Sequence, residues 1–199
     1  AHLFCFLDDH SRLVPHTEFF WEEALPRLER VLKVGKLKRG LPLALYVDNG
    51  KVYHATQFTA ACASLGIACR HTAPYAPESK GKQERFFETV RLQLLPEVET
   101  SAVGTLAELN ESFWAWLELV YHRTVHSETG QSPLERYQAG IAGVRQADGE
   151  TLLWRRRRCS GRPPPSSIRR HGSYPWVGLP IRAWRDLRRR LVDHALQEV

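Results

Sequence analysis

The feature that most constrains this fold is an alternation of strand, helix and strand between residues 43 and 71. Residues 43–47 (Leu-Ala-Leu-Tyr-Val) form a short apolar run typical of a strand buried on both faces. Residues 56–65 have helical character and end at Gly66, and residues 67–71 form the next strand. Strands joined in this way pair in parallel through a crossover. The sequence therefore predicts an α/β fold with its functional groups at strand ends.

The flanking segments predict further elements of the same domain. Residues 3–7 are apolar and precede the turn formers Asp-Asp-His-Ser, and residues 13–20 resume a β-prone pattern, so we expect a hairpin. Apolar side chains at helical spacing predict three helices and a short capped one. They cover residues 21–34 with Pro26 in the first turn, 82–95, 106–122, and the segment that follows Ser132-Pro133. Residues 72–81 are expected to form an irregular loop.

Charge divides the chain into two parts. Residues 1–150 hold 16 Lys and Arg against 19 Asp and Glu, whereas residues 151–199 hold 12 Arg, no Lys and three acids. We therefore predict a core domain at residues 1–140 and a basic, Arg- and Pro-rich, poorly ordered tail at residues 141–199. The net charge of +6 belongs to this tail, so it does not show that the core binds nucleic acid.

Two interpretations of the tail stay open beside phosphate binding. It is either an unstructured run of charge or the product of a shifted reading frame in GC-rich DNA, because Arg and a Pro-Pro-Pro run dominate it. Translation of the other two frames distinguishes them. If neither of the other two frames encodes an alternating pattern typical of β-strands, this would count against the frameshift.

Several classes of protein are disfavoured by composition. No apolar stretch is long enough for a membrane span and no signal-peptide pattern begins the chain, so we expect a cytoplasmic protein without membrane contact. The four cysteines include no Cys-x-x-Cys pair, which indicates reduced thiols. His122 and His126 have metal-ligand spacing, but no cysteine pair or acidic third ligand follows, so we interpret them as structural or surface residues.

Two acids stand where chemistry is expected in an α/β fold. Asp48 directly follows the strand at residues 43–47, and Glu84 lies in the first turn of the helix at 82–95, with 35 residues between them. Taken singly, Asp-Asn-Gly is more typical of a turn than of an active site. A single glutamate at a helix start is more typical of a surface residue that compensates the helix dipole. Their combination with the surrounding sequence carries more weight.

That surrounding sequence resembles the catalytic core of Asp-Asp-Glu transposases and retroviral-type integrases, bacterial insertion-sequence transposases in particular. The resemblance covers residues 1 to about 140. It rests on Asp48-Asn49-Gly50, on PYAPESKGKQER at residues 74–85, on LDDHSRL at 7–13, and on the residues from Tyr121-His122-Arg123 through Ser132-Pro133 to Arg136. It implies a ribonuclease-H-like mixed sheet flanked by helices.

The resemblance also implies a function. Asp48 and Glu84 would be catalytic ligands of two divalent ions, Mg²⁺ or Mn²⁺, because phosphodiester hydrolysis and strand transfer need both reacting oxygens stabilised, and hard cations prefer carboxylates. Tyr75, Lys80, Lys82 and Arg85 would contact DNA, where Tyr75 could equally well be a packing residue. The partners implied are the ends of a mobile element and target DNA. A homo-oligomer is expected, because two DNA ends must be held together.

The family has three catalytic carboxylates, and the first of them, an aspartate, has no evident counterpart here. In the family it lies on a first strand upstream of the hairpin, central in the sheet between the strands at residues 3–7 and 43–47. Asp8 and Asp9 align with the hairpin turn instead. We therefore expect the sheet to lack its first strand and an isolated chain to be unstable. Three hypotheses follow: a truncated polynucleotidyl transferase, an inactive DNA-binding or assembly remnant, and, less favoured, a nuclease of the same fold. The absence of Met fits a truncated copy.

Overall fold

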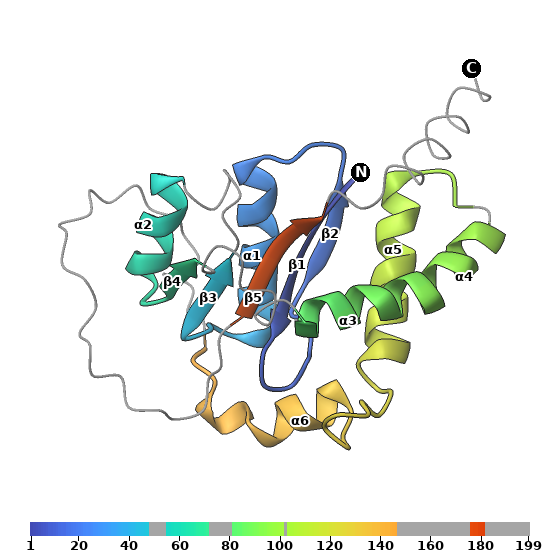
Figure 1. Cartoon of the computed structure of the whole chain (residues 1–199). Helices are drawn as coiled ribbons and strands as arrows, with labels where there is room; N and C mark the ends of the chain where they lie inside the picture. The colour runs from blue at the N-terminus through green and yellow to red at the C-terminus, as the bar shows by residue number, and fades with distance from the viewer. Residues whose placement is uncertain (48–54, 72–80, 102, 147–175, 182–199) are drawn as a thin grey trace.

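A mixed five-stranded sheet forms the centre of the molecule (Figure 1). The computed structural model describes residues 1–47, 55–71, 81–101, 103–146 and 176–181. Its strands lie in the order β2-β1-β5-β3-β4. They are β1 (His2–Asp8), β2 (Thr17–Phe20), β3 (Ala44–Val47), β4 (Ala68–His71) and β5 (Trp176–Ile181). β1 is antiparallel to β2 and to β5, whereas β3 is parallel to β4 and to β5.

Both strand pairs expected from the sequence are confirmed. The hairpin of β1 and β2 pairs His2 with Phe20 and Cys5 with Thr17. The strand-helix-strand unit consists of β3, α2 (Thr56–Ser64) and β4, with Ala44 opposite Ala68 in a parallel ladder. Gly66 follows α2 with φ +64°, the left-handed conformation that favours glycine after a helix.

The central position of the sheet is held by β5, which corrects the expected gap. β5 joins the two expected strand pairs. In its ladder with β1, Ile181 lies opposite Leu3 and Trp176 opposite Asp8. In its ladder with β3, Trp176 lies opposite Leu45 and Gly178 opposite Val47. The expectation of a tail without strands is therefore wrong for residues 176–181. The rest of the tail beyond residue 146 lies outside the described residues, and its order stays a prediction.

Pro180 is compatible with this central position because of the register. Within a strand, the N–H and C=O of one residue point toward the same neighbour. The carbonyl of Phe4 accepts a hydrogen bond from Thr17 Oγ1 on β2 at 3.0 Å, so the backbone polar groups of Phe4 point away from β5. Pro180 lies opposite Phe4 and therefore removes no hydrogen bond from the β1–β5 ladder.

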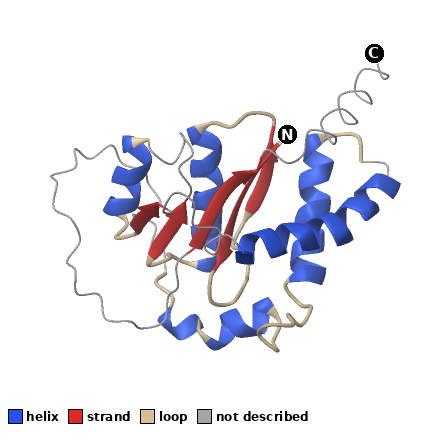
Figure 2. Cartoon of the chain, viewed as in Figure 1, coloured by secondary structure: helices blue, strands red, loops and turns tan. Residues whose placement is uncertain are grey.

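Helices cover both faces of the sheet (Figure 2). On one face, Phe4 and Phe6 of β1 pack in a cluster with α1 (Leu25–Arg39), α2 and β3. On the other face, Leu3, Cys5 and Leu7 pack with α3 (Gly81–Thr89) and α5 (Leu106–Trp116). The alternation along β1 follows from the two-residue period of a strand. The structure is thus the three-layer α/β arrangement expected from the sequence.

The predicted helices are confirmed, with one change of register. The helix that starts with α3 continues through η2 (Val90–Leu94) and α4 (Leu95–Thr100), and α5 continues into η3 (Leu117–Tyr121). Both η segments are π-helical, so each turn contains an extra residue. Consequently Tyr121 is buried, whereas Val120, which a regular helical period would place on the same face as Phe113 and Trp116, is 42% exposed.

Two short helical segments follow the loop after η3. They are α6 (Pro133–Ala139), capped by Ser132 as predicted, and the short turn η4 (Ile141–Gly143). The guanidinium of Arg145 then donates to the carbonyls of Pro42 at 2.8 Å and of Gly66 at 3.2 Å. Packing against the sheet thus extends past residue 140.

Candidate active site

The predicted site residues lie after β3 and at the start of α3. The described residues do not bring these two places together: β3 is antiparallel to β1, and the start of α3 contacts the turn at the carboxyl end of β1, the end of the sheet where β3 begins. Val47 is the last residue of β3, so Asp48 follows at its carboxyl end. Asp48, Tyr75 and Lys80 lie outside the described residues, and their contacts stay predictions. Glu84, Lys82 and Arg85 are described and belong to the first turns of α3.

The amphipathic pattern of α3 determines which side chains face solvent. Phe86, Val90 and Leu94 along this helix are buried against β1. Glu84, Lys82 and Arg85 are exposed on the outer side. A carboxylate in the first turn is favoured by the positive end of the helix dipole, which suits Glu84 to this position. The fold thus presents one carboxylate and two cations together on an accessible helix start.

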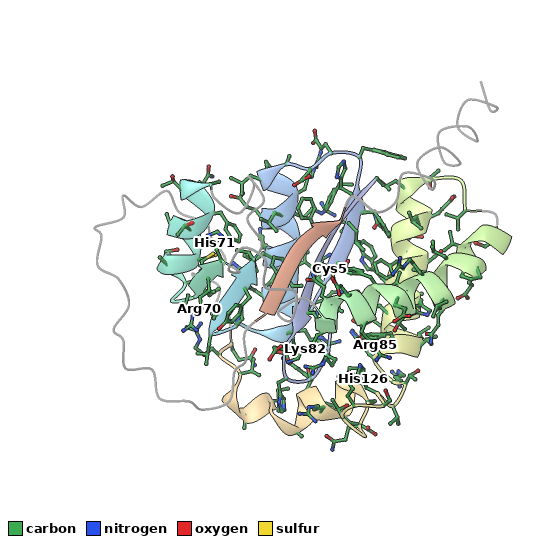
Figure 3. All side chains as sticks on the ribbon, viewed as in Figure 1. Cys5, Arg70, His71, Lys82, Arg85 and His126 are labelled. Atoms are coloured by element: carbon green, nitrogen blue, oxygen red, sulfur yellow. The ribbon has the colours of Figure 1, made fainter. Side chains whose placement is uncertain are left out.

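The hairpin turn lies beside this helix start. Lys82 Nζ is 2.6 Å from Asp9 Oδ1, in an ion pair between α3 and the turn that follows β1. Figure 3 shows Lys82 and Arg85 at this end of α3. The resemblance implies a DNA contact for Lys82, but no local pattern indicates its acidic partner, because the two residues are 73 positions apart.

Asp8 has a structural role in the same turn. Its carboxylate is buried and accepts hydrogen bonds from the backbone N–H of Ser11 at 2.8 Å and from the Ser11 hydroxyl. Burial raises the pKa of Asp8, while the hydrogen bonds from Ser11 and the nearby His10 oppose the rise. The placement of Asp8 in the hairpin turn agrees with the alignment made from the sequence.

His122 is a structural residue that connects three parts of the domain. Its ring is buried, Nε2 accepts from the backbone N–H of Val14 at 3.1 Å, and Nδ1 lies 3.1 Å from Glu118 Oε2. Arg39 at the end of α1 also binds Glu118, at 2.9 Å. Because Nε2 accepts, the neutral ring carries its proton on Nδ1 and donates it to Glu118.

The described residues alone do not complete a metal site. Within the ranges that the structure describes, no group of three or more His, Cys, Asp or Glu is close enough to hold an ion. Glu84 offers an exposed carboxylate, a ligand type that suits Mg²⁺, and Asp48 would be its partner. β5, in the central position where the resemblance implies a first aspartate, has the sequence Trp-Val-Gly-Leu-Pro-Ile without an acid. A third carboxylate is therefore unassigned.

Comparison with known proteins shows which families this chain is similar to. Residues 36–99, which include both Asp48 and Glu84, match the family model of the TnsB C-terminal domain. A transposase for insertion sequence IS1202 from Streptococcus pneumoniae is 30% identical over 125 residues, covering 56% of this chain. The match covers only 26% of the IS1202 transposase, so this chain spans about a quarter of that relative.

Solved structures show a similar fold. The simian T-cell lymphotropic virus intasome, in complex with PP2A regulatory subunit B56 gamma, matches with a TM-score of 0.58 at 22% identity, over 68% of this chain and 47% of that chain. The catalytic core domain of BIV integrase matches with 0.55 at 22%, over 69% and 85%. That of HTLV-2 integrase, in complex with magnesium, matches with 0.54 at 18%, over 68% and 83%.

These structural matches define a ribonuclease-H-like α/β fold. Together with the TnsB and IS1202 matches, they make this chain similar to the catalytic cores of transposases and integrases. The resemblance and the α/β fold expected from the sequence are thereby confirmed. In the part of the chain that the structure describes, no helix is both long and apolar enough to span a membrane.

Proposed function

We propose that this chain takes part in DNA transposition by metal-dependent phosphodiester hydrolysis and strand transfer at the ends of a mobile element. The observation that carries the proposal is the match of residues 36–99 to the TnsB C-terminal domain, since this segment includes both predicted catalytic acids. The exposed cluster of Glu84, Lys82 and Arg85 on α3 supports it.

Each residue has a proposed role. Asp48 and Glu84 would hold divalent ions, and such ions stabilise the charge that develops on the attacking and leaving oxygens. The HTLV-2 integrase core was solved with magnesium, which makes Mg²⁺ or Mn²⁺ the candidate. Lys80, Lys82 and Arg85 would neutralise DNA phosphates, and Tyr75 would stack on a base or sugar.

The proposed partners follow from the same class. We expect the chain to bind element ends and target DNA in the cytoplasm and to work as a homo-oligomer, since the HTLV-2 integrase core was solved in both trimeric and dimeric forms. The alternative is a remnant that binds DNA without chemistry. β5 favours keeping this alternative, because it occupies the sheet centre without bringing an acid.

The deciding experiment compares Glu84→Gln with Glu88→Gln in the full chain. Both residues are exposed on α3 one turn apart, so both variants remove the same charge from the same helix. If the chain is an enzyme, Mn²⁺- or Mg²⁺-dependent nicking of supercoiled DNA is lost in Glu84→Gln and retained in Glu88→Gln. DNA binding without nicking in the unmodified chain, at any Mn²⁺ concentration, would establish the remnant instead.

Binding of Mn²⁺ by itself gives a second measurement. Titration calorimetry of the full chain should detect Mn²⁺ binding that Asp48→Asn and Glu84→Gln each weaken about tenfold or more, because each removes a charged oxygen ligand. Glu88→Gln is again the matched control. Equal Mn²⁺ affinity in all variants would rule out Asp48 and Glu84 as the ligands.

A further inference from the structure

The turn after β1 is held in an unusual conformation. Arg12 has φ +66°, a left-handed backbone conformation that residues other than glycine rarely adopt. Its N–H donates to the Asp8 carbonyl at 2.9 Å, and the Asp8 N–H donates to the Leu13 carbonyl at 2.8 Å. Such a conformation persists only where the surrounding contacts impose it.

Contacts from two other elements impose this conformation. The hydroxyl of Tyr121, at the end of η3, donates to the carbonyl of Arg12 at 3.0 Å. Arg136 of α6 donates from Nε to the carbonyl of His10 at 2.9 Å. The Arg12 guanidinium also donates to the carbonyl of Asp9, which fixes the backbone beside that carboxylate. The turn is thus held from within and from outside, and it presents Asp9 to α3.

The ion pair between Asp9 and Lys82 is exchangeable. Lys82 is 42% exposed and Asp9 is 34% exposed, so solvent reaches both groups. Partly exposed ion pairs of this kind contribute little to stability. A phosphate group that approaches the start of α3 would compete with Asp9 for the same ammonium group.

Two further groups lie on the surface beside Lys82, one a permanent cation and the other a histidine that carries charge only when protonated. Arg85 is exposed on α3, and His126 is half-buried in the loop after η3. Partial burial lowers the pKa of His126; the charges of Arg12 and Arg85 lower it further, and that of Glu128 opposes them. Figure 3 shows Arg85 and His126 at the same end of α3 as Lys82.

We propose that Lys82, Arg85 and His126 form a track for the phosphates of DNA, and that Asp9 is an electrostatic latch on it. In the free protein Asp9 occupies the ammonium group of Lys82, and a phosphate of bound DNA takes its place. This inference rests on the proposed function, because it assumes DNA on the face of Glu84. It adds His126 to the DNA-binding residues and gives the hairpin turn a regulatory role.

The test measures the affinity of the full chain for a fluorescent 30-base-pair duplex as a function of salt. Asp9→Asn should tighten binding roughly two- to fivefold, the scale expected for one exposed ion pair. Glu88→Gln, the matched control, removes a negative charge from α3 six positions from Lys82, so it tests whether the loss of any acid near the track has the same effect. In a Lys82→Ala background, Asp9→Asn should lose its effect, because the two residues act as a pair.

The other members of the track are tested by the salt dependence. Arg85→Ala should reduce the slope of log affinity against log salt by about 1, as for one lost phosphate contact. His126→Gln should weaken binding at pH 5 more than at pH 8, because the pKa of His126 lies below its usual value and only the protonated ring carries charge. The groups that face His126 are Arg12, Arg85 and Glu128, and these stay unchanged in this variant.

The outcomes separate this inference from the proposed function. If the unmodified chain binds DNA, but Asp9→Asn and Glu88→Gln change its affinity equally, the latch is excluded and the function stands. An effect of Asp9→Asn that persists in the Lys82→Ala background also excludes it. Failure of the unmodified chain to bind any duplex would overturn both proposals.

Discussion

The backbone N–H of Val14 donates a hydrogen bond to Nε2 of His122 at 3.1 Å, across 108 positions of sequence. This bond fixes the segment between the hairpin turn and β2 to the end of the helix formed by α5 and η3. Glu118, 3.1 Å from Nδ1 of the same ring, fixes the tautomer that makes Nε2 an acceptor. The His122 ring therefore determines where the turn carrying Asp9 can lie.

Replacement of His122 tests this relationship. His122→Ala leaves the N–H of Val14 buried without an acceptor, and we expect it to lower the free energy of unfolding by about 2–3 kcal/mol. Urea unfolding followed by circular dichroism measures the change. His126→Ala, in a loop that is only half-buried, should cost less than about 1 kcal/mol. Equal losses in the two variants would contradict the structural role of His122.

The pH dependence of stability should report on Glu118. The hydrogen bond from His122, together with the charge of Arg39, lowers the pKa of Glu118 to about 2, although partial burial opposes the shift. The folded-state pKa is thus below the unfolded value of about 4.3. Its contribution is present above pH 4.3 and is lost as the pH falls toward 2.

We therefore expect Glu118→Gln to be less stable than the unmodified chain at pH 6, with a difference that shrinks below pH 4.3. Thermal unfolding at pH 6, 5, 4 and 3 provides the comparison. A difference that stays constant down to pH 3 would show that the Glu118 carboxylate does not carry the effect.

Strand β5 can be tested through its register with β1. Leu179 lies opposite Cys5 in an antiparallel ladder, and in such a pair the Cα atoms are within the range that a disulfide can bridge. Leu179→Cys should allow the introduced thiol to form a disulfide with Cys5 after mild oxidation with diamide, found by mass spectrometry of the digested chain. Gly178→Cys, opposite Phe6, should give no link to Cys5. Linkage in neither variant would place another segment at the sheet centre.

The start of α5 offers a test of local helix stability. Thr105 accepts from the N–H of Glu108 at 3.2 Å, and the Glu108 carboxylate accepts from the N–H of Thr105 at 3.0 Å, which completes a capping box. Thr105→Ala should cost about 1 kcal/mol in urea unfolding, whereas Thr105→Ser should cost little, because it keeps the hydroxyl. Equal costs for both substitutions would exclude the cap as the cause.

The candidate site was predictable to the extent that it is local in sequence. Glu84 and the cations beside it share the first turns of one helix, and the apolar spacing of Phe86, Val90 and Leu94 predicts which side faces outward. Asp9 and His126 belong to the same region but lie 73 and 44 positions from Lys82. No local pattern indicates such neighbours, because only the packed fold brings them together.

The sequence by itself determined the elements of this protein and its resemblance to a known family. Two-residue and helical periodicities specify the hairpin, the parallel unit and the helices, since each depends on neighbouring residues. The motifs around Asp48 and Glu84 carry the resemblance to the transposase and integrase core. Only the tertiary structure decided that Trp176–Ile181 lies between β1 and β3, where the sequence predicts a gap. Pairing between strands depends on which backbone groups at a strand edge lack a partner, more than on the side-chain pattern. A segment containing Gly178 and Pro180 can therefore complete this sheet, because the register places the proline where it makes no hydrogen bond to β1.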